Sequence, residues 1–268
     1  MRTSALLETD TVGSREIEAV WNMIQASVLL TSLDLGDEFR KVVPFLRTFK
    51  TAFREKPRTI VCSDDRVNLD IVPTLDFAGQ LIFATDEELV EFATRYYRQI
   101  DVVFSHAGCG AAKKMLETIG GQGGHEFSDR LGATHSQKLA KMLGPRTKVD
   151  HIHAEGPHKA RMLILDGTAR FNPLVIPAMP QTFKCSAPGC GMPERYIARE
   201  LELLLSVAFN REHSIGAYLS HRHPFYVIII AKDGSQLVWL LSLAEEVAKD
   251  YGKKVRVDGV NVSGMLSA

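Results

Sequence analysis

Apolar residues recur along this chain with two periods, and the alternation between them predicts the fold. Short apolar runs suit buried parallel strands and cover residues 59–62, 101–105, 160–166, 225–231 and 254–260, with a further strand within 69–77. Spacings of three and four residues predict helices over 86–98, 111–118, 128–143, 194–209 and 236–251. This order predicts an α/β fold with a parallel-core sheet flanked by helices.

Two regions frame this predicted sheet. Residues 14–54 have helical spacing and predict two helices, the second kinked or split at Pro44. After Pro173 the prolines crowd a linker-like stretch before strands and helices resume. We therefore expect a first domain over residues 1–177 and an additional C-terminal α/β segment over 178–268, packed on the same sheet or on a partner subunit. The sequence shows no internal repeat.

Composition narrows the functional classes. Apolar residues make up 45% of the chain and charged residues 24%, which is typical of a globular protein with a sizeable core. Lys plus Arg and Asp plus Glu both number 32, so no net charge favours nucleic acid or an anionic membrane. No segment has the roughly 18 uncharged apolar residues of a membrane span, nor does the N-terminus resemble a secretory signal. We expect a cytoplasmic protein with a small-molecule substrate and neither a nucleic-acid nor a membrane partner.

Residues with metal-binding chemistry follow two of the predicted strands. Cys62 ends one strand, and His106 and Cys109 follow another, three residues apart in a tight turn. Catalytic zinc takes three protein ligands and keeps a fourth position open, and two thiolates with an imidazole favour zinc over magnesium or calcium. We predict one Zn²⁺ per subunit, bound by these three residues. The alternative is two buried structural cysteines and a core histidine.

A candidate carboxylate lies beside the first of these ligands. Asp64 and Arg66 are two residues apart, so in an extended segment their side chains point to the same side. An arginine can bind a carboxylate through two hydrogen bonds, which orients it and keeps it ionised. The alternative for such a pair is a surface ion pair of little energetic value.

These motifs together resemble a known family. Cys62-Ser63-Asp64-Asp65-Arg66 with His106-Ala107-Gly108-Cys109-Gly110 is similar to the paired signature of the β-class carbonic anhydrases, and the likeness covers residues 38–174. The resemblance implies a β-carbonic-anhydrase-like fold, zinc bound by Cys62, His106 and Cys109, and a catalytic dyad of Asp64 and Arg66. It implies reversible hydration of carbon dioxide to bicarbonate through a zinc-bound hydroxide that the dyad orients. It also implies a homodimer or higher homo-oligomer.

The chain departs from the family pattern at three positions. Asp65 replaces the usual Ser, Ser105 replaces a common Gly, and Glu55 stands where many relatives have a Gln that helps bind bicarbonate. Two alternatives therefore stay open. One is hydrolysis of carbon disulfide or carbonyl sulfide on the same fold, and the other is a non-catalytic zinc protein that binds a partner through its C-terminal region.

The remaining histidines and cysteines have simpler interpretations. His151, His153 and His158 could together bind a metal, but we favour a solvated loop, and a loop at the sheet edge explains His221 and His223. Cys185 and Cys190 could form half of a second zinc site. No further ligands with matching spacing lie nearby, so we favour free thiols.

Overall fold

The computed structural model describes most of the chain after residue 55. The described residues are 56–67, 74–121, 124–154, 158, 160, 162–171, 182–210, 219 and 224–263. The predicted N-terminal helices, Glu55, the predicted domain boundary at residue 177, and both His221 and His223 lie outside the described residues. Among the described residues, no helix combines the length and the apolar composition needed to cross a membrane.

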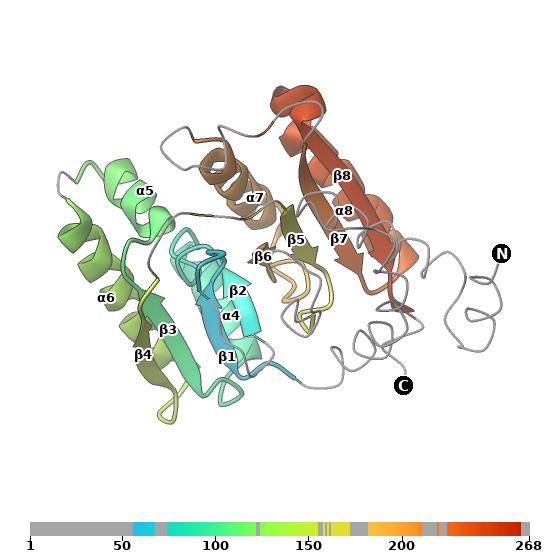
Figure 1. Cartoon of the computed structure of the whole chain (residues 1–268). Helices are drawn as coiled ribbons and strands as arrows, with labels where there is room; N and C mark the ends of the chain where they lie inside the picture. The colour runs from blue at the N-terminus through green and yellow to red at the C-terminus, as the bar shows by residue number, and fades with distance from the viewer. Residues whose placement is uncertain are drawn as a thin grey trace, which may run out of the picture.

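The described chain forms two four-stranded parallel sheets with helices against them (Figure 1). The first sheet has the order β2-β1-β3-β4, with β1 at Thr59–Cys62, β2 at Thr74–Phe77, β3 at Val102–His106 and β4 at Lys148–Ile152. The second sheet has the order β6-β5-β7-β8, with β5 at Met162–Asp166, β6 at Phe183–Cys185, β7 at Phe225–Ala231 and β8 at Val255–Asn261. The predicted α/β class with parallel strands and flanking helices is confirmed, in two sheets.

The helices lie between the strands in chain order. They are α4 at Asp86–Arg95, α5 at Gly110–Thr118, α6 at His125–Leu143, α7 at Glu194–Phe209, α8 at Gly234–Ala248 and the short 3₁₀ helix η2 at Lys249–Lys254. α4 begins with a capping box, because the Thr85 hydroxyl accepts from the Glu88 N–H while the Glu88 carboxylate accepts from the Thr85 N–H. The helix predicted over 236–251 instead ends at Ala248, where η2 continues the chain.

The two sheets share one topology. When the strands of each sheet are numbered from its own first strand, both have the order second, first, third, fourth. The sheets approach each other where β2 and β6 contact. There the Ser186 N–H donates to the Asp76 carbonyl at 2.8 Å, and the Asp76 N–H donates to Ser186 Oγ at 3.0 Å. β5 precedes the linker-like stretch that follows Pro173, so the second sheet contains residues from both sides of that stretch.

One apolar core runs through both sheets. Strands β1, β2 and β5 are buried along their whole length, as expected for parallel strands covered on both faces. We call the part of the chain through β4 the first half and the part from β5 onward the second half. Phe77 and Phe92 of the first half and Phe183 and Tyr196 of the second half belong to the same cluster of buried side chains. The predicted ligands Cys62 and Cys109 lie in a second, smaller cluster of buried side chains at the carboxyl ends of the first sheet.

Candidate metal centre

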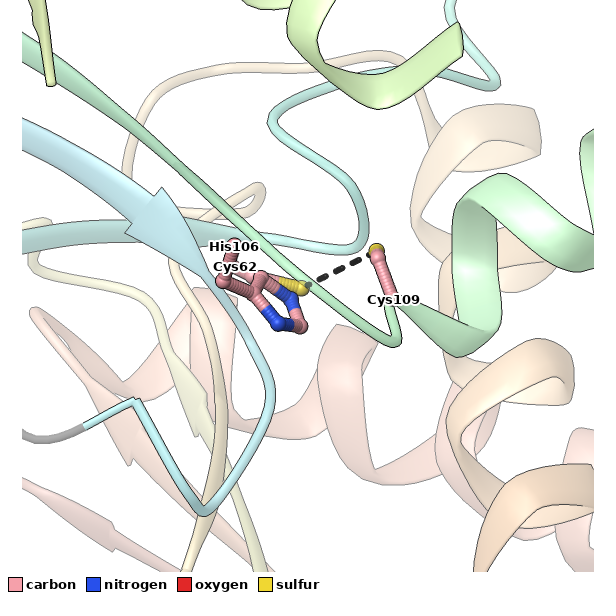
Figure 2. A group of neighbouring side chains, drawn as sticks. All are labelled: Cys62, His106 and Cys109. Atoms are coloured by element: carbon pink, nitrogen blue, oxygen red, sulfur yellow. Dashed lines mark hydrogen bonds between the residues drawn. The ribbon is translucent and has the colours of Figure 1, made fainter. Parts of the chain in front are cut away.

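The three predicted ligands converge at the carboxyl edge of the first sheet (Figure 2). Cys62 is the last residue of β1, His106 is the last residue of β3, and Cys109 is the residue before α5. Their ligand atoms all lie within 4.8 Å of one another, and the two Sγ atoms are 3.9 Å apart. All three side chains are buried. Because β1 and β3 are parallel neighbours, their ends meet at the same edge.

The turn that returns Cys109 to this edge depends on a glycine. Gly108 has φ of +66°, a left-handed conformation that favours glycine over residues with a Cβ. Its N–H donates to the Asp129 carboxylate of α6 at 2.8 Å. The turn between β3 and α5 is therefore held both by backbone conformation and by a hydrogen bond from a neighbouring helix.

The donor atoms of this cluster suit a metal ion. His106 Nδ1 lies 2.9 Å from the Ala107 carbonyl, which orients the ring and leaves Nε2 as the nitrogen that could bind a metal ion. Nε2 is buried and has no hydrogen-bond partner among the described residues. The Cys109 side chain makes no capping hydrogen bond to α5, although it occupies the capping position. Buried polar atoms normally have partners, so the unpartnered Nε2 beside two thiols fits a site that could hold a metal ion.

The charges in the cluster are strongly coupled. A hydrogen bond from the Cys109 thiol holds the pKa of Cys62 below its usual value despite burial, and the same bond, together with burial, raises the pKa of Cys109. Burial opposes a charge on His106, but the Cys62 thiolate outweighs burial and raises the pKa of His106 to about 9. A metal ion would therefore displace protons from the cluster as it binds.

Asp64 and Arg66 form the predicted pair beside the ligands. Arg66 Nε donates to Asp64 Oδ1 at 2.9 Å, and Nη2 donates to Oδ2 at 2.6 Å. Burial acts to raise the pKa of Asp64, but the hydrogen bonds of Arg66 and the nearby histidine charges outweigh it and lower that pKa. Asp64 Oδ2 lies 3.9 Å from His106 Nε2. Both side chains are largely buried, so the pair is not a surface ion pair.

A small cavity of about 20 Å³ opens beside the cluster, which is room for roughly one water-sized molecule. Its polar lining is Cys62, Asp64 and His158. Its apolar lining comes from both halves of the chain and consists of Ala78, Ala111, Phe183, Leu203, Leu204 and Val207, with Gly110 completing the wall. The side chains of β6 and α7 thus face the candidate centre of the first sheet.

The prediction of a solvated loop is wrong for His158. This histidine is buried, and its Nδ1 lies 2.5 Å from Asp65 Oδ1 and 3.6 Å from Asp64 Oδ1. The other oxygen of Asp65 accepts from the Ala160 N–H at 2.7 Å. The signal in the sequence was the second carboxylate at Asp65, directly after Asp64, because Asp65 contacts the histidine. By contrast, His151 and His153 are exposed.

Cys185 and Cys190 are buried and form no disulfide. Burial raises the pKa of both cysteines, to about 12 for Cys190. Within the described part of the chain, neither belongs to a group of residues that could hold a metal ion. Two groups of described residues could hold a metal ion, namely Cys62 with His106 and Cys109, and Asp64 with Asp65 and His158.

Sequence reasoning missed one buried carboxyl group next to the centre. Glu200 of α7 is 2% exposed, and its Oε1 accepts from Ser63 Oγ at 3.1 Å and from the Ala78 N–H at 2.6 Å. Burial raises the pKa of Glu200 to about 7. Its position on the apolar face of α7, between Ile197 and Leu204, was the available signal.

Comparisons with known proteins do not extend this picture. The site consists of three ligand atoms, a carboxylate bound by an arginine, and a small cavity. Searches against protein-family models, curated proteins and solved structures found no match to this chain.

Proposed function

We propose that this chain is a zinc enzyme that reversibly hydrates carbon dioxide to bicarbonate. The observation that carries the proposal is the convergence of Cys62, His106 and Cys109 beside a carboxylate that Arg66 binds through two hydrogen bonds. Two thiolates and an imidazole are a ligand set typical of catalytic zinc. Three protein ligands leave a fourth position for water or substrate.

A zinc ion at this centre would supply Lewis acidity and a hydroxide nucleophile at neutral pH. Asp64 would accept a hydrogen bond from the nucleophile and so orient it toward the substrate carbon. Arg66 keeps Asp64 ionised and fixes its direction, because its guanidinium donates to both carboxylate oxygens. A low pKa for Asp64 fits an acceptor that stays ionised throughout turnover.

The cavity supports a small, uncharged substrate. Most of its lining is apolar, and its volume of about 20 Å³ suits a molecule of very few atoms. Carbon dioxide is linear, apolar and triatomic, and it requires no charged group for binding. The apolar side chains of α7 and β6 would hold it next to the nucleophile and limit the access of bulk water.

The same cavity favours a second candidate reaction. Carbonyl sulfide and carbon disulfide are also linear, apolar and triatomic, and the same nucleophile would attack their carbon atoms. The two sulfur compounds are larger than carbon dioxide, so the small cavity favours carbon dioxide among the three. Parallel assays of the three substrates on one zinc-loaded sample distinguish these reactions.

The decisive experiment is stopped-flow hydration of carbon dioxide by the zinc-loaded chain and by D64N. We expect the variant to lose about 100-fold in kcat/KM while it retains its zinc, because Asp64 orients the nucleophile without being needed to bind the metal. The matched control is D86N, which changes an exposed carboxylate that pairs with Lys138 and belongs neither to the ligand cluster nor to the cavity lining. A zinc-loaded native chain that does not accelerate hydration would overturn the proposed reaction and favour a non-catalytic zinc protein.

A further inference from the structure

Helix α7 of the second half lies directly against the candidate metal centre. Leu203, Leu204 and Val207 line the cavity beside Cys62. A Cβ built on Gly110, the first residue of α5, would lie 3.9 Å from a methyl group of Val207. The helix that follows β6 is therefore in contact with the segment that carries Cys109.

Glu200 joins this helix to the two backbone segments around Cys62. Its Oε1 accepts from Ser63 Oγ, and Ser63 is the residue after Cys62. The same oxygen accepts from the Ala78 N–H, and the next residue, Gly79, donates its own N–H to Cys62 Sγ at 3.3 Å. One side chain thus binds the carboxyl ends of both β1 and β2 at the point where they hold the Cys62 sulfur.

The environment of Glu200 differs from that of the other buried glutamate nearby. Glu88 is 3% exposed, and its carboxylate pairs with Arg195 and Arg199 of α7 at 2.8 and 3.0 Å. The donors to Glu200 at Ser63 and Ala78 are neutral, and Oε2 has no hydrogen-bond partner among the described residues. Burial of a carboxyl group without a cationic partner is unfavourable. A role beyond attaching α7 would explain why this position is a glutamate.

We propose that Glu200 is a positioning residue for the metal centre, through which the second half of the chain holds Cys62 in the geometry that the ion requires. The proposal rests on the proposed function, because it needs the three ligands to bind a metal. Substitution of a residue that orients a metal ligand without contacting the ion commonly changes the metal affinity by about 10- to 100-fold. Glu200 meets that description, since it fixes the residue after Cys62 and the segment that donates to the Cys62 sulfur.

The experiment compares three variants of the full chain in cobalt(II) titrations. E200L removes the acceptor, E200Q retains an oxygen acceptor in nearly the same volume, and E202L changes an exposed glutamate on the same helix. Competition with a chromophoric chelator gives the cobalt affinity. The visible absorption bands of cobalt(II) report the geometry of the thiolate and imidazole ligands, so neither readout depends on turnover.

We expect E200L to bind cobalt(II) at least about tenfold more weakly than the native chain and with shifted absorption bands. E200Q should keep the native bands and an affinity within about threefold, because its amide oxygen still accepts from the Ala78 N–H. E202L should match the native chain in both measurements. A folded E200L with native affinity and native bands would overturn the proposal.

A second variant decides the question if E200L does not fold. S63A removes only the hydroxyl that donates to Glu200, and we expect it to shift the cobalt(II) bands and weaken binding by about threefold. A folded S63A with unchanged bands and affinity would contradict the role of Glu200. A native chain that binds no cobalt(II) would overturn the metal centre of the proposed function. A native chain and an E200L that both bind cobalt(II) equally well would overturn only the role of Glu200.

Discussion

The two sheets of this protein have the same strand order but use their strand ends differently. In the first sheet, β1 ends with Cys62 and α5 is preceded by Cys109. In the second sheet, the matching positions are Asp166 at the end of β5 and Asp233 before α8. Topology alone therefore does not create the candidate centre, since the same arrangement of strands occurs twice in the described chain.

The difference lies in what these side chains bind. Asp166 accepts from the N–H groups of Thr168 and Phe171, and Asp233 caps α8 by accepting from the Gln236 N–H. In the second sheet, the strand ends thus satisfy their own backbone. In the first sheet, Cys109 caps nothing and His106 Nε2 has no partner among the described residues. The edge of the first sheet therefore differs from that of the second in holding a buried ligand nitrogen that no described residue satisfies.

The largest effect should come from removing a ligand. C109S should weaken zinc binding by more than about 100-fold, beyond the usual effect of a residue that only supports a ligand. C185S, which changes a buried thiol of the second sheet, should leave zinc affinity unchanged. Both are measured by chelator competition on the purified chain. Equal losses of zinc affinity in C109S and C185S would contradict a metal site that belongs to the first sheet alone.

A pH dependence should appear at Glu200, the residue that joins the two halves. Its pKa in the folded chain is about 7, against 4.5 as the ordinary value, so folding favours the protonated form. The stability contribution of this group is therefore present below pH 4.5 and is lost as the pH rises through 7. In metal-free protein, the free energy of unfolding of E200Q relative to the native chain should rise by about 2.5 kcal/mol from pH 5 to pH 8.

Urea unfolding of both proteins with a chelator present measures this difference. E202Q is the matched control, because Glu202 is exposed on the same helix. An E200Q advantage that stays constant between pH 5 and pH 8 would contradict a raised pKa for Glu200.

Asp166 tests whether the matching strand end of the second sheet is structural. D166A should lower the free energy of unfolding by about 2 kcal/mol, because it leaves buried N–H groups without their acceptor. Zinc affinity should not change. C62A should have the opposite profile in metal-free protein, with a smaller loss of stability and no remaining zinc binding. Chemical denaturation and chelator competition on the same samples compare the two variants. Loss of zinc binding in D166A would contradict a purely structural role for Asp166.

The smallest effects should appear at the two helix N-termini. D233A should destabilise the fold by about 1 kcal/mol, since it removes the side-chain acceptor that caps α8. C109S should stabilise the metal-free chain by up to about 1 kcal/mol, because a serine hydroxyl can cap α5 where the thiol does not. Thermal unfolding of metal-free samples measures both. Destabilisation of metal-free C109S would show that Cys109 has a structural role.

Much of this architecture could be predicted from the sequence because the strands that carry the site are short, apolar and largely buried. The helix at 194–209 and the strand at 225–231 were predicted at their observed bounds. β4 was missed because Lys148–Ile152 is largely exposed and polar, and β6 because three residues in a proline-rich stretch give no period to detect. The shared strand order was not detectable either, since the sequence shows no repeat.

The candidate site was predictable only in part. Cys62, His106 and Cys109 lie at strand ends whose convergence follows from parallel topology. Glu200 and His158 come from segments 90 or more residues further along the chain, as the separations of 137 and 93 residues from their partners Ser63 and Asp65 show. No local pattern encodes such contacts, which depend on how the two halves pack. The predicted homodimer stays a prediction.

The most direct test of this account is native mass spectrometry of the intact chain after loading with excess zinc and removal of weakly bound metal. We expect one zinc ion per chain and none in C109S, because Cys109 is one of the three ligands and, among the described residues, the second sheet of the same topology carries no group that could hold a metal. A chain without zinc, or one that still holds its zinc in C109S, would contradict it.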